Sequence, residues 1–154
     1  MIKPRVLIDT SFLLPALGID VEREAIEAIA LFRRLEVYYL EIGLIEALWK
    51  ALKLVPQDKL YRVKQGLEAI KRTYQLLEPP VEAYIEAIEI YHRGHRDYID
   101  ALHYTSAKNT NIPWLTIDND FIEFLRNQNY PIQGIVLTPR ELPRLVYLRK
   151  TKLS

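Results

Sequence analysis

The stretch VLIDTSFLL, residues 6–14, is a short apolar run interrupted by an acid. Three consecutive apolar residues, Val6 to Ile8, followed at once by Asp9, are typical of a strand buried on both faces of a parallel sheet. A signal-peptide core avoids charge, so Asp9 also argues against a leader sequence here. The stretch therefore predicts a buried first strand with a carboxylate at its carboxyl end.

Strand and helix patterns alternate along the rest of the chain. Short segments rich in β-branched and aromatic residues occur at 37–39, 114–117 and 135–137. Helices are predicted over about 20–35, with Asp20 as the cap, and over 42–54, 58–77, 81–92, 97–108 and 119–127. Within 58–77, Asp58 can cap the helix, and the apolar spacing of three and four residues up to Leu77 indicates a packing seam. The alternation implies an α/β fold with a mostly parallel sheet.

The composition indicates one compact domain with enough apolar material for a core. The chain has 154 residues, of which 49% are hydrophobic and 27% charged, and it has no cysteine. Disulfides and thiolate metal sites are therefore excluded, which fits a cytoplasmic protein. No apolar run is long enough for a membrane span. We expect a single domain over residues 1–154.

Charge is unevenly distributed along the chain. The formal net charge is +1, which by itself does not suggest a nucleic-acid partner. Residues 140–154 form a basic C-terminal tail, in which five basic residues accompany one acid, Glu141, for a net charge of +4. Such a tail could contact phosphate, or it could serve solubility or a dimer contact.

Two predicted strands are followed by an acid. Asp9 follows residues 6–8, and Asp118 follows residues 115–117. Because ligands bind at the carboxyl ends of the strands in an open parallel sheet, the two carboxylates are candidates for one site. Taken alone, each is more often the cap of the helix that follows.

Two further acids lie on predicted helices with apolar neighbours on both sides. Glu46 lies in GLIEALWKA and Asp100 in DYIDALHY. Burying an unpaired carboxylate is costly, so each needs a partner. Lys50, four residues after Glu46, and Arg96, four residues before Asp100, would meet that need as ordinary ion pairs.

A set of converging carboxylates implies a cation. Acids gathered at one edge of a sheet repel each other, and all-oxygen sites suit Mg²⁺ or Mn²⁺ better than Zn²⁺. Such an ion can also offset charge on a phosphoryl group during its transfer. The histidines, His92, His95 and His103, match no zinc motif, and neither a glycine-rich phosphate loop nor a GxSxG elbow occurs.

These motifs resemble the PIN domain family of ribonucleases. VLIDTSFLL is similar to the opening strand of that family, and IDALHYTSAKNTNIPWLTIDNDF, residues 99–121, is similar to its second half. The resemblance runs from about residue 5 to residue 138. It implies a three-layer α/β/α sandwich with a mostly parallel central sheet. It also implies a Mg²⁺- or Mn²⁺-dependent endoribonuclease.

The resemblance also implies roles for individual residues. The catalytic acids and metal ligands would be Asp9, Glu46, Asp100 and Asp118. Supporting residues near the site would be Thr10, Ser11, Thr116, Asp97 and Asp120. Among these, Asp97 is the substitute candidate for Asp100, and Ser11 stands where Asn is common in the family.

Partners follow from the same resemblance. Family members of this size are commonly toxins of toxin–antitoxin pairs of the VapC type, so RNA as substrate, a homodimer and an antitoxin partner are expected. Lys50, Lys53 and Arg96 are candidates to hold the RNA backbone, and the seam within 58–77 could offer a groove to an antitoxin helix. A PIN-like module that only binds RNA or a partner stays open as the alternative. A phosphatase of the haloacid-dehalogenase class is disfavoured, because it needs a second Asp where the chain has Ser11.

Overall fold

A parallel five-stranded sheet forms the centre of the protein in a computed structural model that describes residues 2–152, with side chains described up to residue 147. The strand order is β3-β2-β1-β4-β5. Their bounds are β1 (Arg5–Ile8), β2 (Glu36–Tyr39), β3 (Gln75–Leu76), β4 (Trp114–Leu115) and β5 (Val136–Leu137). Every pairing between neighbouring strands of this sheet is parallel. Among residues 2–152, every helix is too short or too polar to traverse a bilayer.

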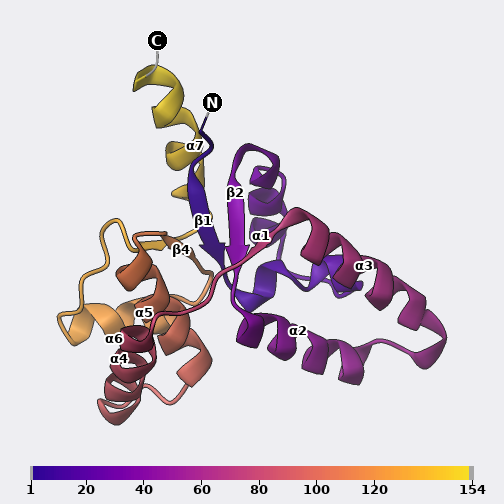
Figure 1. Ribbon diagram of the computed structural model, residues 1–154, viewed down its shortest axis with the longest axis horizontal. Helices are drawn as coiled ribbons and strands as arrows, with labels where there is room; N and C mark the ends of the chain where they lie inside the picture. The colour runs from indigo at the N-terminus through magenta and orange to yellow at the C-terminus, as the bar shows by residue number, and fades with distance from the viewer. Residues whose placement is uncertain (1, 153–154) are drawn as a thin grey trace.

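The alternation of side chains along β1 assigns the helices to two layers. Val6 and Ile8 point into one apolar cluster and Leu7 into the other, and all three are fully buried. The first layer holds α1 (Arg23–Ile29), α2 (Glu41–Leu54), α3 (Leu60–Thr73) and α7 (Leu142–Lys152). The second holds α4 (Val81–His92), α5 (Tyr98–Thr110) and α6 (Asn119–Asn127), on the other side of the sheet (Figure 1). The predicted three-layer α/β/α sandwich is therefore confirmed, and burial on both faces explains the uninterrupted apolar run in β1.

The strand order reverses next to β1. The chain passes from β1 outward through β2 to β3, and then returns to build β4 and β5 on the opposite side. Ile8 is level with Leu115 in the β1–β4 register, so Asp9 and Thr116 follow the two strands side by side. In sheets of this kind such a reversal opens a crevice at the carboxyl ends of the strands.

The helix predicted over 20–35 is in fact two shorter elements. It consists of α1 and a 3-10 turn, η3 (Phe32–Arg34), and Asp20 is not its cap, because the capping position falls at Glu22 without a side-chain hydrogen bond. The predicted apolar stripe is nevertheless buried at Ala25, Phe32 and Leu35. Phe32 and Leu35 are three residues apart, a spacing that a 3-10 turn places on one side.

The helix predicted over 58–77 is also too long. It begins at Leu60 after a short 3-10 turn, η4 (Gln57–Lys59), so Asp58 does not cap it, and it ends at Thr73. Residues beyond it form the edge strand β3, and the amide of Leu77 donates to the carbonyl of Tyr39 at 2.9 Å. Leu77 still packs against the core, but from extended backbone. Strand pairing has overridden a helical pattern here, because tertiary contacts outweigh weak local preferences.

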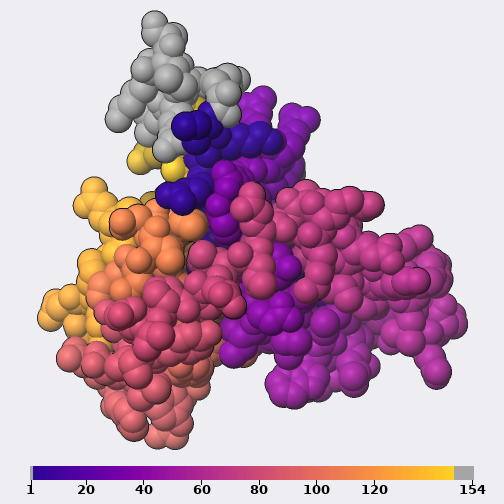
Figure 2. All heavy atoms as spheres, in the orientation of Figure 1, coloured from indigo at the N-terminus to yellow at the C-terminus, as the bar shows by residue number. Residues whose placement is uncertain are grey.

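The seam of α3 packs inside the chain itself. Val63, Leu67 and Ile70 belong to the apolar cluster that also holds η1 (Thr10–Phe12) and η2 (Pro15–Leu17). Gly66 brings the helix backbone against η2, since a Cβ at this position would lie 1.8 Å from the carbonyl oxygen of Ala16. Together α2 and α3 project from the body as an arm (Figure 2).

Helix α7 begins within the segment expected as a basic tail, residues 140–154. Leu142 and Val146 are buried in the same cluster as α1. The start of the segment is thus part of the core, whereas the side chains of Arg149, Lys150 and Lys152 lie outside the described residues.

Candidate active site

Asp9 is a buried carboxylate held at both oxygens. Its side chain follows β1 and is 6% exposed. The Oδ1 atom accepts a hydrogen bond of 2.8 Å from the amide of Thr10, and Oδ2 accepts one of 2.8 Å from the hydroxyl of Thr116. The first bond caps η1, and the second ties β1 to the end of β4. Asp9 is therefore a helix cap and also a fixed member of a polar cluster.

Thr116 links Asp9 to Asp118. Its hydroxyl oxygen accepts a hydrogen bond of 3.1 Å from the amide of Asp118 while it donates to Asp9. Asp118 in turn caps α6, with its Oδ1 accepting from the amide of Phe121 at 3.0 Å. Because Thr116 is fully buried, this chain of bonds positions the two strand-end carboxylates without solvent.

Asp100, on α5, lies close to Asp9 and Asp118. It lies in the first turn of the helix, where the macrodipole favours a negative charge, and its side chain is 13% exposed. Asp97 occupies the capping position before Tyr98, with its Oδ1 accepting from the amides of Ile99 at 3.0 Å and Asp100 at 3.2 Å. The cap of α5 therefore holds Asp100 in place.

Burial, followed by repulsion between carboxylates, determines the electrostatics of this site. Burial, the charge of Asp9 and a hydrogen bond with Asp118, in that order, raise the pKa of Asp100 to about 9, with a further contribution from Asp97. The carboxyl of Asp100 therefore keeps its proton at neutral pH. We call Asp9, Asp100 and Asp118 the aspartate cluster.

His95 borders the aspartate cluster, which the sequence did not suggest. Its Nε2 lies 3.7 Å from Oδ2 of Asp100, and its ring stacks on Phe121 with centroids 4.2 Å apart. Burial lowers the pKa of His95, against the opposing charges of Asp97 and Asp118, so the imidazole is uncharged at neutral pH. The contact with the protonated Asp100 is therefore not an ion pair. No spacing motif could have found His95, because the turn between α4 and α5 brings it to the site.

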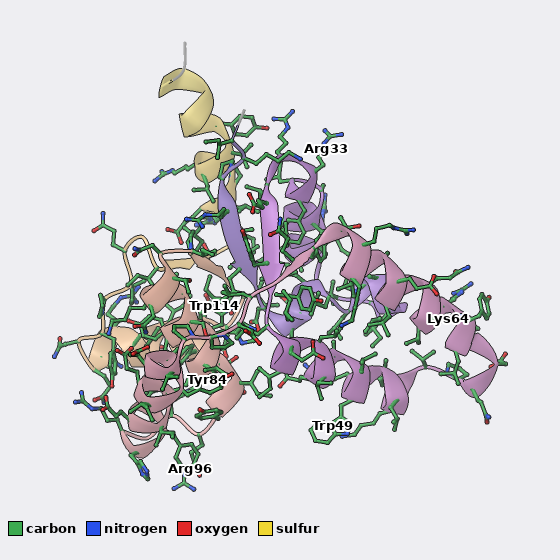
Figure 3. All side chains as sticks on the ribbon, in the orientation of Figure 1. Arg33, Trp49, Lys64, Tyr84, Arg96 and Trp114 are labelled. Atoms are coloured by element: carbon green, nitrogen blue, oxygen red, sulfur yellow. The ribbon has the colours of Figure 1, made fainter. Side chains whose placement is uncertain are left out.

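The ion pairs considered from sequence do not form. Arg96 is exposed and projects away from the body of the protein (Figure 3), and it makes no ion pair with Asp100. Among the side chains that the structure describes, the carboxylate of Glu46 makes neither a hydrogen bond nor an ion pair, with Lys50 or any other group.

Glu46 lies on the helix that flanks the cluster. One turn before it, Gly43 meets residues near the site: a Cβ there would lie 3.1 Å from Nε2 of His103 and 3.5 Å from Oγ1 of Thr10. Residues three apart share a helix face, so half-buried Glu46 lies on the face of α2 that faces η1 and α5. Glu46 is not among the charges that raise the pKa of Asp100.

The remaining sequence candidates lie at the margin. Ser11 is half-buried in η1. Thr10 is buried with an Oγ1 that has no hydrogen-bond partner among the described residues. Asp120 is exposed in the first turn of α6 and does not contribute to the pKa shift of Asp100.

The carboxylate oxygens of the aspartate cluster are the kind of ligand that hard divalent cations prefer. Within residues 2–147, no group of three His, Asp or Glu side chains stands ready to hold a metal ion. The cluster nevertheless offers carboxylate oxygens, and burial together with the repulsion of the neighbouring acids leaves one carboxyl protonated. Because a cation relieves that repulsion, binding would displace the proton of Asp100.

Solved structures share the fold at low sequence identity. PAE2754 from Pyrobaculum aerophilum superposes with a TM-score of 0.61 at 20% identity, over 94% of this chain and 96% of that one. A toxin–antitoxin complex from Klebsiella pneumoniae gives 0.61 at 19% identity, over 87% and 97%. FitAcB from Neisseria gonorrhoeae gives 0.59 at 19% identity, again over 87% and 97%. At such identities the likeness establishes the fold alone.

The family follows from the sequence match. The comparison with curated proteins found no match. The family model described as "PIN domain" matches residues 6–126, which span β1 to α6 and include the whole aspartate cluster. The chain therefore belongs to the PIN domain family.

Proposed function

We propose that this protein is a metal-dependent endoribonuclease that hydrolyses RNA phosphodiester bonds, as the toxin of a toxin–antitoxin pair. Membership of the PIN family supports the nuclease part, since PIN domains are generally nucleases that depend on divalent metal ions. The observation that carries the proposal is the aspartate cluster at the point where the strand order reverses, where burial and the neighbouring acids raise the pKa of Asp100.

Asp9, Asp100 and Asp118 would hold Mg²⁺ or Mn²⁺, with Glu46 completing the acidic set from α2. When bound, a divalent cation supplies positive charge that offsets the charge developing on a phosphodiester under attack. The supporting role proposed for Thr10, Ser11, Thr116, Asp97 and Asp120 rests on their places around these acids.

The protein's own contribution is to preorganise the carboxylates. Two hydrogen bonds fix both oxygens of Asp9, so its orientation needs no rearrangement when substrate arrives. The capping bonds of Asp97 and Asp118 hold the first turns of α5 and α6 in place. When Asp100 releases its proton, the cluster becomes more negative by one charge, which matches a bound cation.

Basic side chains on α2 are candidates to hold the RNA backbone. Lys50 and Lys53 are exposed, and they follow Glu46 along α2 by about one and two turns. Exposed Arg96 lies one residue after His95, which borders the cluster. Contacts from these residues to phosphate would position RNA without reading its sequence.

The proposal includes a homodimer, an antitoxin partner and a cytoplasmic location. Two of the similar structures are described as a toxin–antitoxin complex and as FitAB bound to a DNA fragment, the latter with a TM-score of 0.62 and 18% identity. Apolar side chains exposed along α2, including Trp49 at 65% and Leu52 at 76%, supply protein-binding surface, and Trp49 projects into solvent (Figure 3). The absence of cysteine is in keeping with the cytoplasm.

The decisive experiment compares RNA cleavage by the purified protein and by Asp9→Asn, with Mn²⁺, with Mg²⁺ and with chelator. Asp58→Asn, an exposed acid on η4, is the matched control for loss of one charge. We expect cleavage by the wild type and the control only when metal is present, and none by Asp9→Asn. Cleavage that persists in chelator or in Asp9→Asn would refute the proposal. A folded wild type that binds RNA without cutting it would favour the non-catalytic module.

A further inference from the structure

Among the described residues, the side-chain nitrogen that borders the aspartate cluster is Nε2 of His95. We propose, building on the proposed function, that this nitrogen is a direct ligand of the bound metal ion and makes the site prefer Mn²⁺ to Mg²⁺. His95 would thus set the metal preference of this particular chain.

The first argument is that Nε2 has no partner in the protein. It is buried and makes no hydrogen bond with any described residue, although it lies only 3.7 Å from Oδ2 of Asp100. That distance is too long for a hydrogen bond. A buried polar atom without a partner costs free energy unless something else satisfies it. A cation held by Asp100 would satisfy both atoms at once.

The second argument is that the ring is held in place. His95 stacks on Phe121 at 4.2 Å and packs against Phe124 at 5.2 Å between ring centroids. The amide of Phe121 also donates to the carboxylate of Asp118. One residue therefore anchors both the imidazole and a member of the aspartate cluster, which fixes their relative position as a ligand set requires.

The other two histidines do not meet these conditions. His103 is also buried with an unpaired Nε2, but that atom lies against Gly43, and its Nδ1 donates to the carbonyl of Ile99 at 2.8 Å. His92 is exposed at the end of α4, with its ring against Tyr91. Of the histidines, His95 is the one that contacts an aspartate of the cluster.

Ligand chemistry supplies the metal preference. Mg²⁺ is a hard ion that binds oxygen ligands and keeps several waters. Imidazole nitrogen binds first-row transition ions, and Mn²⁺ among them also accepts carboxylate oxygens. One nitrogen added to a carboxylate set therefore strengthens the binding of Mn²⁺ more than that of Mg²⁺.

The direct test is pulsed electron paramagnetic resonance of Mn²⁺ bound to the wild-type protein. A ligated imidazole couples its ¹⁴N nucleus to the electron spins of the ion, and we expect that modulation in the wild type. It should disappear in His95→Gln and persist in His92→Gln, the matched control. Because the wild-type spectrum needs no variant, a folding defect in His95→Gln cannot obscure the result.

Titration calorimetry supplies the second readout. We expect His95→Gln to weaken Mn²⁺ binding by about tenfold or more, the effect typical of losing a group that supports a metal site, with Mg²⁺ binding changed by less than about twofold. His92→Gln should leave both affinities as in the wild type.

The outcomes separate this inference from the proposed function. Mn²⁺ that binds without ¹⁴N modulation, or a variant His95→Gln with an unchanged Mn²⁺ to Mg²⁺ ratio, would overturn the role of His95 and leave a carboxylate-only nuclease. A wild type that binds neither ion would overturn both.

Discussion

Replacing Thr116 with Val removes one hydroxyl from the centre of the aspartate cluster at almost constant shape. The substitution takes away the donor to Oδ2 of Asp9, at 2.8 Å, and the acceptor for the amide of Asp118, at 3.1 Å. Thr116 is fully buried, so water does not readily take the place of the hydroxyl. The change therefore leaves a carboxylate and an amide without one partner each.

The structure sets the size of the effect. A hydrogen bond to a charged group contributes about 1.5–3 kcal/mol, and a buried group left unpaired costs about 1–3 kcal/mol. Val keeps the β-branch and opens no large cavity, and its added methyl recovers part of the loss, by about 1 kcal/mol. We expect Thr116→Val to lower the free energy of unfolding by about 2–4 kcal/mol.

Thr105→Val is the matched control on α5. Thr105 is 1% exposed, and its hydroxyl donates to the carbonyl of Ala83 at 2.7 Å, a neutral partner that is not part of the aspartate cluster. The expected loss is about 0.5–1.5 kcal/mol, the usual net contribution of a neutral hydrogen bond.

Urea unfolding in chelator and RNA cleavage in Mn²⁺ measure the two consequences separately. Thr116→Val should lose more stability than the control, and its cleavage rate should fall by about 10- to 100-fold because Asp9 is no longer held in place. Thr105→Val should cut RNA as the wild type does under conditions where it is folded. Equal stability losses together with unimpaired cleavage by Thr116→Val would refute the view that this hydroxyl orients Asp9.

Two further predictions concern packing and charge. Gly66→Ala should destabilise the protein by about 2 kcal/mol or more in urea unfolding, because the new Cβ would lie 1.8 Å from the carbonyl oxygen of Ala16. Overpacking of that kind outweighs the gain in helix propensity of about 1 kcal/mol. A more stable variant would show that α3 does not lie against η2. Metal-free protein should lose stability as the pH rises from 7 to 9, because the raised pKa of Asp100, about 9, means that the folded state holds a proton that the unfolded chain releases. The lowered pKa of His95 makes stability rise with pH, and it does so at lower pH. A loss of stability between pH 7 and 9 therefore reports on Asp100. Thermal melts measure this change, and added Mn²⁺ should remove the pH dependence. If stability instead rises towards pH 9 without metal, the predicted protonation of Asp100 is wrong.

Sequence patterns located the elements that are buried or strongly periodic. The apolar run at β1 predicted a strand with both faces covered, and Val6, Leu7 and Ile8 are all fully buried. Helices α2, α4 and α6 lie within one or two residues of their predicted bounds. Such elements are predictable because their local preference and their tertiary environment agree.

The errors lie where tertiary contacts compete with the local pattern. The helical spacing of Tyr74 and Leu77 concealed the edge strand β3, which exists because the backbone of β2 offers hydrogen-bonding groups there. Asp20 and Asp58 are good capping residues by type, but the helices begin three and two residues later. A two-residue strand leaves almost no signal in the sequence, since its stability comes from its neighbour in the sheet.

Some features of the candidate site are visible in the sequence, and others arise only in the folded chain. Acids at strand ends and in apolar helical segments are visible in the sequence because residue type and local pattern suffice to single them out. Their convergence depends on strand order and on the register of β1 with β4, which sets Asp9 beside Thr116 over a sequence separation of 107 residues. The protonation of Asp100 and the approach of His95 likewise arise only in the folded chain. Burial and distance determine both of these properties, and the linear sequence specifies neither until the sheet and its helices have assembled.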